Sequence, residues 1–498
     1  MAFENSQAVT IEGKKALLTD QFESSCRLEL PNDKTVKNVL GVSAVAKITA
    51  QEKVSDGVNF SGNTYYHVVY QTEEGTLGSV SAVASWQEKL DMIDATNFVI
   101  TPEIKENVVT TQSLNEIEIS SLITVTVFGI TADKIYNVDG MGNDYVKLEN
   151  AHEYQKAVNF VTDTFNEVSE LQLGGKVEDV LSYFANVHLK NVTAGIDTVT
   201  LEGEAFVNTA LLVDGEIVNQ VKTIEFKHET AVLSTVPNNT VDANIVLSGL
   251  NVTASVSEID GNSNIIYALE MTADISVYSK DSMVAVEDLF SVEKVTSCQY
   301  ECVKSNIFEG DNFYTDNQII SMPLDQEVQD ICFINSATAS VSDVVKNEDK
   351  FLVNGAVSVD AVFRLENQEN ILLNGLAPFT VEIADFNDED ELKVSVKVLS
   401  YKLKTQSEVA LTLEIDVNQK KYQKSFITYV SSVQEEDDKV QNDAGIRVYI
   451  TGENENLFNI AKTINVRPED ILSQNPEAEN NFAKGTRLVI YNPLNLNF

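Results

Sequence analysis

The side chains best suited to chemistry are few in this sequence, and they lie far apart. Four histidines occur in 498 residues, and none is paired with another at a spacing of four or sits in a Gly-x-Ser-x-Gly motif. They are His67, His152, His188 and His228. Lys176 follows two glycines but lacks the first glycine and the hydroxyl residue of a phosphate-binding loop. Zinc hydrolysis, nucleophile-elbow chemistry and nucleotide binding therefore have no support.

Two further features have the residue types of a metal site but not the number of ligands. Cys298 and Cys302 have a ligand-like spacing, yet no second pair completes the four ligands of a structural zinc site. The acidic run at 385–391 lacks the glycine at position six of an EF-hand loop, which favours a solvated loop. Carboxylates are so abundant that no pair of them indicates acid–base catalysis. The sequence predicts a protein that is not an enzyme and has no metal or cofactor.

The charge balance narrows the class of partner. Lys and Arg number 35 against 76 Asp and Glu, a formal net charge of −41, which disfavours nucleic acid and anionic membrane surfaces. The longest apolar run, 122–130, is too short for a membrane span of about 18 residues or more. The first residues do not resemble a secretory signal, and the four cysteines are sparse. We therefore expect a cytoplasmic protein without a membrane span.

Most of the chain alternates apolar and polar residues with a period of two, which is typical of half-buried β-strands. Leu411–Val417 is one such stretch, and turn dipeptides such as Asp214-Gly215 and Asn374-Gly375 separate the apolar runs. The segment 151–165 also fits a helical spacing, but its place in the chain favours a strand in its later half. The predicted fold is mainly antiparallel β.

A set of anchor residues recurs three times at fixed offsets, which indicates tandem β modules. Each set begins with a pentad, followed after 26 or 27 residues by a glycine, then by a large apolar residue and an aromatic one. The pentads are Val36–Leu40, Val177–Leu181 and Val328–Cys332. The glycines are Gly62, Gly203 and Gly355, the apolar residues Tyr70, Leu211 and Phe363, and the aromatics Trp86, Phe226 and Phe379. The aromatics are expected to be core anchors between two sheets, as in a β-sandwich.

These repeats set the predicted domain boundaries. Modules are expected at 1–140, 141–300 and 301–430, followed by an acidic linker at 431–444 that contains the run Glu435–Asp438. The remaining segment, 445–492, is predicted to fold as strand, helix, helix and strand (βααβ). Its first helix places Leu457, Ile460 and Ile464 on one face, and Pro468 begins the second.

The C-terminal segment resembles a LysM module. Phe458-Asn-Ile-Ala461, Glu469-Asp-Ile-Leu472 with Asn475, and Gly485-Thr-Arg-Leu-Val-Ile490 match the family pattern. The chain departs from it at 454–456, where Asn-Glu-Asn replaces the family's Gly-Asp-Thr before the first helix. The added side chains favour protein over glycan as the ligand. The rim of the module is the predicted binding site, with Phe458 as an exposed aromatic anchor beside Asn454, Asn456, Asn475 and Pro476.

Three β modules followed by LysM resemble the SipL group of clostridial sporulation proteins. The resemblance implies a non-catalytic scaffold or adaptor in assembly of the spore coat and cortex, located in the mother cell at the forespore surface. It also implies docking on the coat-basement ATPase of the spore through the LysM module. Three alternatives stay open at this point: a protein that binds peptidoglycan or other N-acetylglucosamine glycans, a self-associating shell or filament protein, and an enzyme whose site is hidden in the β modules. The missing export signal counts against the first, and the missing catalytic motifs count against the last.

Overall fold

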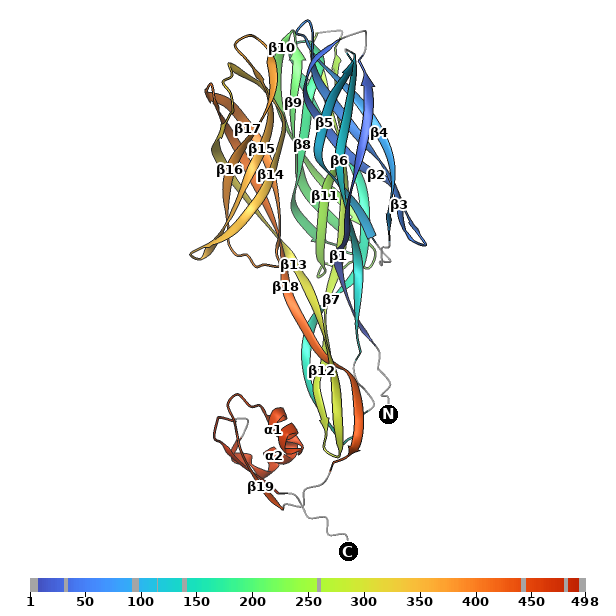
Figure 1. The fold of residues 1–498 in the computed structure, drawn as a ribbon, viewed down its shortest axis with the longest axis vertical. Coiled ribbons are helices and arrows are strands. Elements are labelled where there is room, and N and C mark those ends of the chain that lie inside the picture. The colour runs from blue at the N-terminus through green and yellow to red at the C-terminus, as the bar shows by residue number, and fades with distance from the viewer. Residues whose placement is uncertain are drawn as a thin grey trace.

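The computed structural model describes residues 8–30, 35–91, 98–113, 115–136, 141–257, 261–439, 445–478 and 482–491. The fold is mainly β, as predicted, and all of its sheets are antiparallel. Both α-helices are short, and no helix in the described residues has the length and apolar content that crossing a membrane requires. Figure 1 shows an elongated molecule, with a broad β head at one end and a small helical unit at the other.

Eighteen of the described strands form three successive sets of six, here called the first, second and third units. The first unit contains β1 (Val9–Glu29), β2 (Val36–Val54), β3 (Gly57–Thr72), β4 (Leu77–Asp91), β5 (Phe98–Ser113) and β6 (Glu116–Ile135). The second contains β7 (Tyr145–Leu173), β8 (Val177–Ala194), β9 (Thr198–Val213), β10 (Glu216–Ala231), β11 (Thr240–Val256) and β12 (Ser263–Ser291). The third contains β13 (Lys294–Pro323), β14 (Asp330–Asn347), β15 (Lys350–Arg364), β16 (Asn370–Ile383), β17 (Glu391–Thr405) and β18 (Glu408–Asp438).

Each unit has the same strand order. In the first unit one sheet is β2-β3-β4 and the other is β1-β6-β5, and the second and third units repeat this arrangement. The two sheets pack face to face, with β2 against β5 and β1 against β4 in the first unit. Period-two alternation explains these strands, because each sheet buries one row of side chains; β16 buries every second residue from Gly375 to Ile383.

The recurrent glycines lie directly opposite the recurrent aromatics. Gly62 pairs with Trp86, Gly203 with Phe226 and Gly355 with Phe379, and all three aromatic side chains are buried. A Cβ atom on any of these glycines would come within 2.5 Å of the facing ring and of a backbone carbonyl. Glycine is therefore required where the aromatic ring crosses the neighbouring strand.

The pentads have a role that their sequence did not reveal. Their last residues, Leu40, Leu181 and Cys332, share one buried cluster with Val69, Ala210 and Val362 from the strands beside them. The three units thus meet at a common apolar centre within the head.

The longest strands leave the head as a stalk. β7, β12, β13 and β18 are 29 to 31 residues long, and they run together from the head toward the helical unit (Figure 1). Met283, Tyr154 and Tyr429 are buried together on this stalk. The segment 151–165 lies within β7, so its later half is a strand as expected.

Two predicted boundaries are wrong because the stalk strands continue through them. The boundary at 300/301 falls inside β13, and the one at 430/431 falls inside β18. The acidic run Glu435–Asp438 is not linker: β18 pairs with β13 there, and Lys294 forms an ion pair with Glu435 at 2.9 Å. Residues 440–444 of the expected linker lie outside the described residues. Residues 137–140, on the N-terminal side of the 140/141 boundary, also lie outside them.

The C-terminal unit follows the strand, helix, helix, strand order. It contains β19 (Ile446–Ile450), α1 (Leu457–Ile464), α2 (Pro468–Gln474), the 3-10 turn η2 (Pro476–Ala478) and β20 (Arg487–Tyr491). Ile460, Ala461 and Ile471 from the helices are buried with Leu488 and Ile490 from β20. Leu457 and Ile464, predicted on the same helical face as Ile460, are half-buried and pack beside this core.

Candidate functional site

The turn before α1 uses its polar residues to shape the backbone. Asn454 adopts a left-handed conformation with φ of 59°, which asparagine tolerates better than most residues. Glu455 accepts hydrogen bonds from the backbone N–H of Gly452 at 2.7 Å and the hydroxyl of Tyr449 at 2.8 Å. Asn456 caps α1 by accepting from the Asn459 N–H at 2.8 Å. Asn454 and Asn456 are nevertheless exposed, as a binding rim requires.

Asn475 has a structural role that occupies its side chain. Its Nδ2 donates to the carbonyl oxygens of Ile471 and Val489, each at 2.9 Å, and its Oδ1 accepts from the Val489 N–H at 2.7 Å. These bonds tie the end of α2 to β20. Pro476 is exposed at the start of η2. Asn454 and Asn456 lie in the turn before α1, whereas Asn475 and Pro476 lie in the turn after α2, so the predicted rim is built from two turns.

Phe458 is not the exposed anchor that was expected. Its side chain is only 7% exposed, and its ring lies 5.5 Å from the ring of Phe290, edge to face. Phe290 belongs to the stalk, so α1 has one apolar face for its own unit and a second apolar contact with β12. Exposure predicted from the isolated module is wrong because the stalk covers this residue.

Polar contacts reinforce the docking of the C-terminal unit on the stalk. Lys462 pairs with Asp288 at 2.7 Å, Arg467 donates to the carbonyl of Asn143 at 2.7 Å, and Asn465 donates to that of Val292 at 2.9 Å. The side of the unit that carries α1 is therefore occupied within the chain.

The opposite side of this unit carries an apolar surface that sequence reasoning missed. Ile446, Val448 and Ile450 alternate along β19 and point outward, with exposures from 49% to 67%, and Tyr491 lies beside Ile446 across the sheet. We call these four residues the outer face. The polar partners in the alternation, Arg447 and Tyr449, are half-buried instead. The signal available in the sequence was the alternation of Ile446, Val448 and Ile450, which puts three apolar side chains on one face of a short strand. Such a face either joins a core or forms an exposed apolar patch.

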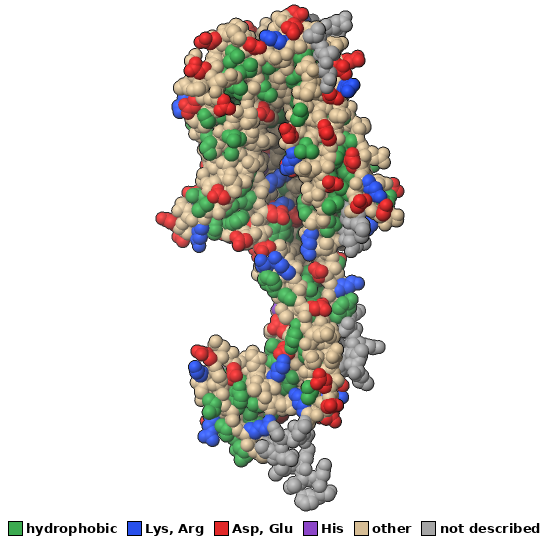
Figure 2. All heavy atoms as spheres, in the orientation of Figure 1, with side chains coloured by type: hydrophobic (Ala, Val, Ile, Leu, Met, Phe, Trp, Pro, Cys, Tyr) green, Lys and Arg blue, Asp and Glu red, His purple; other side chains and the backbone are tan. Residues whose placement is uncertain are grey.

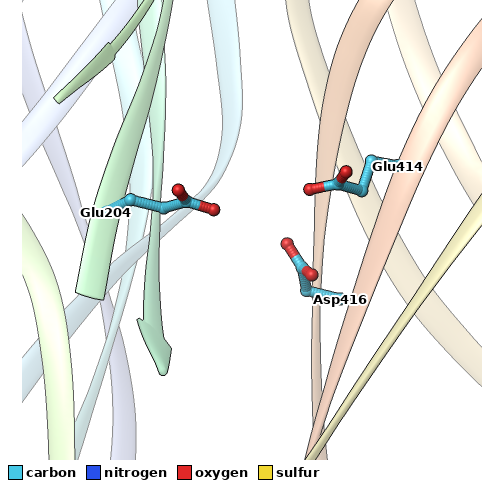
Figure 3. A group of neighbouring side chains, drawn as sticks. All are labelled: Glu204, Glu414 and Asp416. Atoms are coloured by element: carbon cyan, nitrogen blue, oxygen red, sulfur yellow. The ribbon is translucent and has the colours of Figure 1, made fainter. Parts of the chain in front are cut away.

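A second group of interest is a cluster of three carboxylates between the second and third units, Glu204, Glu414 and Asp416 (Figure 3). Their oxygen atoms lie within 4.8 Å of one another, a spacing that would suit a metal ion. However, the Lys397 ammonium group forms ion pairs with all three, at 3.1 Å from Asp416. The lysine therefore supplies the positive charge that a metal would otherwise supply.

The environment of Lys397 fixes its charge. Burial alone would lower its pKa, but hydrogen bonds to Glu204 and Glu414 raise the pKa above its usual value. Burial raises the pKa of Glu204, yet hydrogen bonds from Lys190 and Lys397 bring it below its ordinary value. The cluster is an internal ion-pair network that joins two units, and its geometry gives it a structural role.

A related group lies where the second and third units meet nearer the stalk. Lys420 forms an ion pair with Asp242 and donates to the carbonyl of Ala243 at 2.9 Å. Asp311 lies near this pair with one buried oxygen that has no hydrogen-bond partner among the described residues. Burial raises the pKa of Asp311 to about 6.

The Asp311→Asn variant should be more stable than the natural protein above pH 6. The raised folded-state pKa means that the ionised Asp311 destabilises the fold above pH 6, and that protonation restores stability as the pH falls through 6 toward 4. Asparagine resembles the protonated form, so its advantage should shrink over the same range. Urea unfolding from pH 8 to pH 4.5 tests this, with Asp388→Asn on an exposed loop as the control. A constant difference between Asp311→Asn and the natural protein would contradict it.

Comparisons with protein-family models, curated proteins and solved structures gave no match to this chain.

Proposed function

We propose that this protein is a non-catalytic scaffold or adaptor that acts in assembly of the bacterial spore envelope and docks a partner protein through its C-terminal LysM-like unit. The observation that carries the proposal is the separation of two different surfaces. A β head lies at one end of the stalk, and a small unit with an unpartnered apolar outer face lies at the other (Figure 1). This arrangement suits a protein that holds two structures at a distance.

The sequence resemblances supply the biological setting of the proposal. The three sets of six strands support the tandem modules expected from the recurrent anchors, and the strand, helix, helix, strand order of the C-terminal unit supports the resemblance to LysM. By resemblance to the SipL group, the partner is the coat-basement ATPase of the spore, and the site of action is the mother-cell side of the forespore surface.

Two observations favour a protein ligand over a glycan. First, the side-chain groups of Asn475 and the side-chain oxygen of Asn456 are already bonded to the backbone of the unit, which leaves few polar groups to bind a sugar. Second, the outer face offers four large apolar side chains, and such exposed patches are typical of protein interfaces. We therefore place the docking surface on the outer face of β19 and β20, in addition to the exposed turns at Asn454 and Pro476.

The Val448→Asp variant should lose partner binding by at least about tenfold while keeping its fold. A carboxylate at the centre of the outer face would have to be desolvated in an apolar interface, but it stays in water in the free protein. Binding of the purified coat-basement ATPase, measured by calorimetry, checks this prediction. Val168→Asp is the matched control, because Val168 is also an exposed strand valine, on β7.

Two results would contradict the proposal. Undiminished binding by Val448→Asp would exclude the outer face as the docking surface. Micromolar saturation of the full chain by chitin oligomers or peptidoglycan fragments would instead favour the wall-binding alternative.

A further inference from the structure

The three units contact one another in a cyclic order. β4 of the first unit contacts β8 of the second, β10 of the second contacts β14 of the third, and β16 of the third contacts β2 of the first. These are equivalent strands at each junction, so the head closes on itself like a three-membered ring made from one chain.

A second set of contacts is extensive at two of the three junctions. β11 of the second unit packs against β2, and β17 of the third unit packs against β8. Within the latter junction, Asn186 on β8 donates to the carbonyl of Val396 on β17 at 2.7 Å, and Lys397 joins the carboxylate cluster. At these two junctions, a strand of the following unit fills the space beside the second strand of the preceding unit.

At the third junction the corresponding strands, β5 and β14, both contribute residues to the lining of a cleft of about 1700 Å³. Figure 2 shows the hollow that runs between the two sides of the head. The cleft reaches all three units, because it is also lined by residues 37–46 of β2, by residues of β5 between 102 and 111, by residues 183–186 of β8, and by parts of β11 and β16. The ring therefore has one open junction, at the position that a strand fills in the other two.

The walls of this cleft are strand edges. β5 and β14 each lie at the edge of a three-stranded sheet, where one side of the backbone has no neighbouring strand within that sheet. β2 and β16 are also edge strands, but they contact each other and β11 packs against β2. Unpaired edge N–H and C=O groups are a template for another strand. Ser43 on β2 adds a buried hydroxyl that has no hydrogen-bond partner among the described residues. Backbone edges and an unsatisfied hydroxyl both suit an extended peptide.

The charges of the lining indicate the kind of peptide. Lys37 is paired with Glu369 at 3.1 Å and Lys105 with Glu103 at 2.5 Å, so both lysines of the lining are already neutralised. Glu106 and Asp360 also line the cleft and have no ion pair with a described residue. The remaining charge is negative, which favours a basic segment over an acidic one.

We propose that this cleft binds an extended, basic polypeptide segment of a partner protein by strand addition to the edges of β5 and β14, the two strands that correspond to the packed pairs of the other junctions. The site lies in the head, so it is separate from the docking surface on the C-terminal unit. If the peptide-binding proposal failed, the proposed docking function of the C-terminal unit would be unaffected.

The probe is a synthetic peptide of residues 391–405, the β17 sequence that fills the junction between the second and third units. This peptide contains four lysines and one glutamate and is therefore basic. A control peptide with proline at 396 and 398 has nearly the same side chains but cannot donate the backbone hydrogen bonds of a strand. Binding to the full chain is measured by fluorescence anisotropy. Hydrogen exchange is followed at residues 102–111 of β5 and 335–338 of β14.

We expect saturable binding of the natural peptide and exchange slowed at least about fivefold at both edges. The proline peptide should bind at least about tenfold more weakly. Leu372→Arg places a bulky cation in the cleft and should weaken binding to a similar degree, whereas Leu376→Arg should leave it unchanged. Both leucines are exposed on β16, but only Leu372 lines the cleft, so the pair is matched. Unfolding midpoints of both variants verify that the head is intact.

Several outcomes would overturn the proposal. These are no binding of the natural peptide, equal binding of the proline peptide, binding that persists in a folded Leu372→Arg variant, and no change in exchange at either edge. Protection of the same edges by a neutral oligosaccharide but not by the peptide would also overturn it and would assign the cleft to a glycan.

Discussion

Replacing Lys397 with methionine is expected to lower the free energy of unfolding by about 3 to 5 kcal/mol, because it leaves buried carboxylates without their cation. Lys397 is 8% exposed at its side chain and pairs with Glu204, Glu414 and Asp416. Methionine retains most of the side-chain volume, so the loss reports the charge rather than a cavity. Urea unfolding at pH 7.5 measures the effect.

The matched control is Lys350→Met. Lys350 also pairs with a glutamate, Glu382, at 2.5 Å, but both side chains are more than half exposed. Exposed pairs of this kind contribute little to stability, because water and salt screen them, so this variant should unfold close to the natural protein. The deficit of Lys397→Met should also shrink as the pH falls, because protonation removes the repulsion among the carboxylates. Equal effects for the two variants, or a deficit independent of pH, would contradict a stabilising role for the network.

Replacing Phe379 with alanine is expected to lower the free energy of unfolding by about 3 to 5 kcal/mol, the usual cost of truncating a buried aromatic residue. The ring is 3% exposed within the core of the third unit and lies over Gly355. A Cβ atom at Gly355 would lie 2.3 Å from Cζ of Phe379 and 2.2 Å from the Ser340 carbonyl oxygen. Gly355→Ala should therefore also destabilise the protein, by about 1 to 3 kcal/mol or more.

The double variant distinguishes packing from two independent effects. Without the ring, the Cβ of Gly355→Ala loses one of its two clashes, so the combined loss should be smaller than the sum of the single losses. Gly13→Ala is the control, because a Cβ atom added to Gly13 in β1 would meet no neighbouring atom within 4 Å. We expect it to change stability by about 0.5 kcal/mol or less. Strict additivity at Gly355 and Phe379 would mean that the ring does not compete for this space.

The predictions that depend only on neighbouring residues in the sequence, such as the strands and the two helices, were confirmed. Alternation with a period of two indicates strands because side chains of a strand point to opposite faces, and most of the chain is strand. The spacing of Leu457, Ile460 and Ile464 indicated α1, and Pro468 marked the start of α2. The recurrent glycine and aromatic positions were also recognisable, since each pair forms one cross-strand contact between adjacent strands.

The errors in the candidate site arose where the decisive neighbour is distant in sequence. Phe458 belongs to a helix whose spacing shows which residues share a face, but not that Phe290, far earlier in the chain, covers it. Acidic residues in Glu435–Asp438 suggested a linker because their charge favours solvent, yet pairing with β13 and Lys294 holds them in a strand. In both cases a long-range contact outweighed the local preference.

The sequence by itself determined that this chain forms antiparallel strands with three recurrent sets of anchors and ends in a βααβ segment. Only the tertiary structure decided what each apolar face meets. Leu40, Leu181 and Cys332 look alike as strand residues, but they converge on one centre between the units, whereas Ile446, Val448 and Ile450 remain in solvent. A period of two fixes which residues share a face, and the burial of that face depends on contacts between segments far apart in the chain.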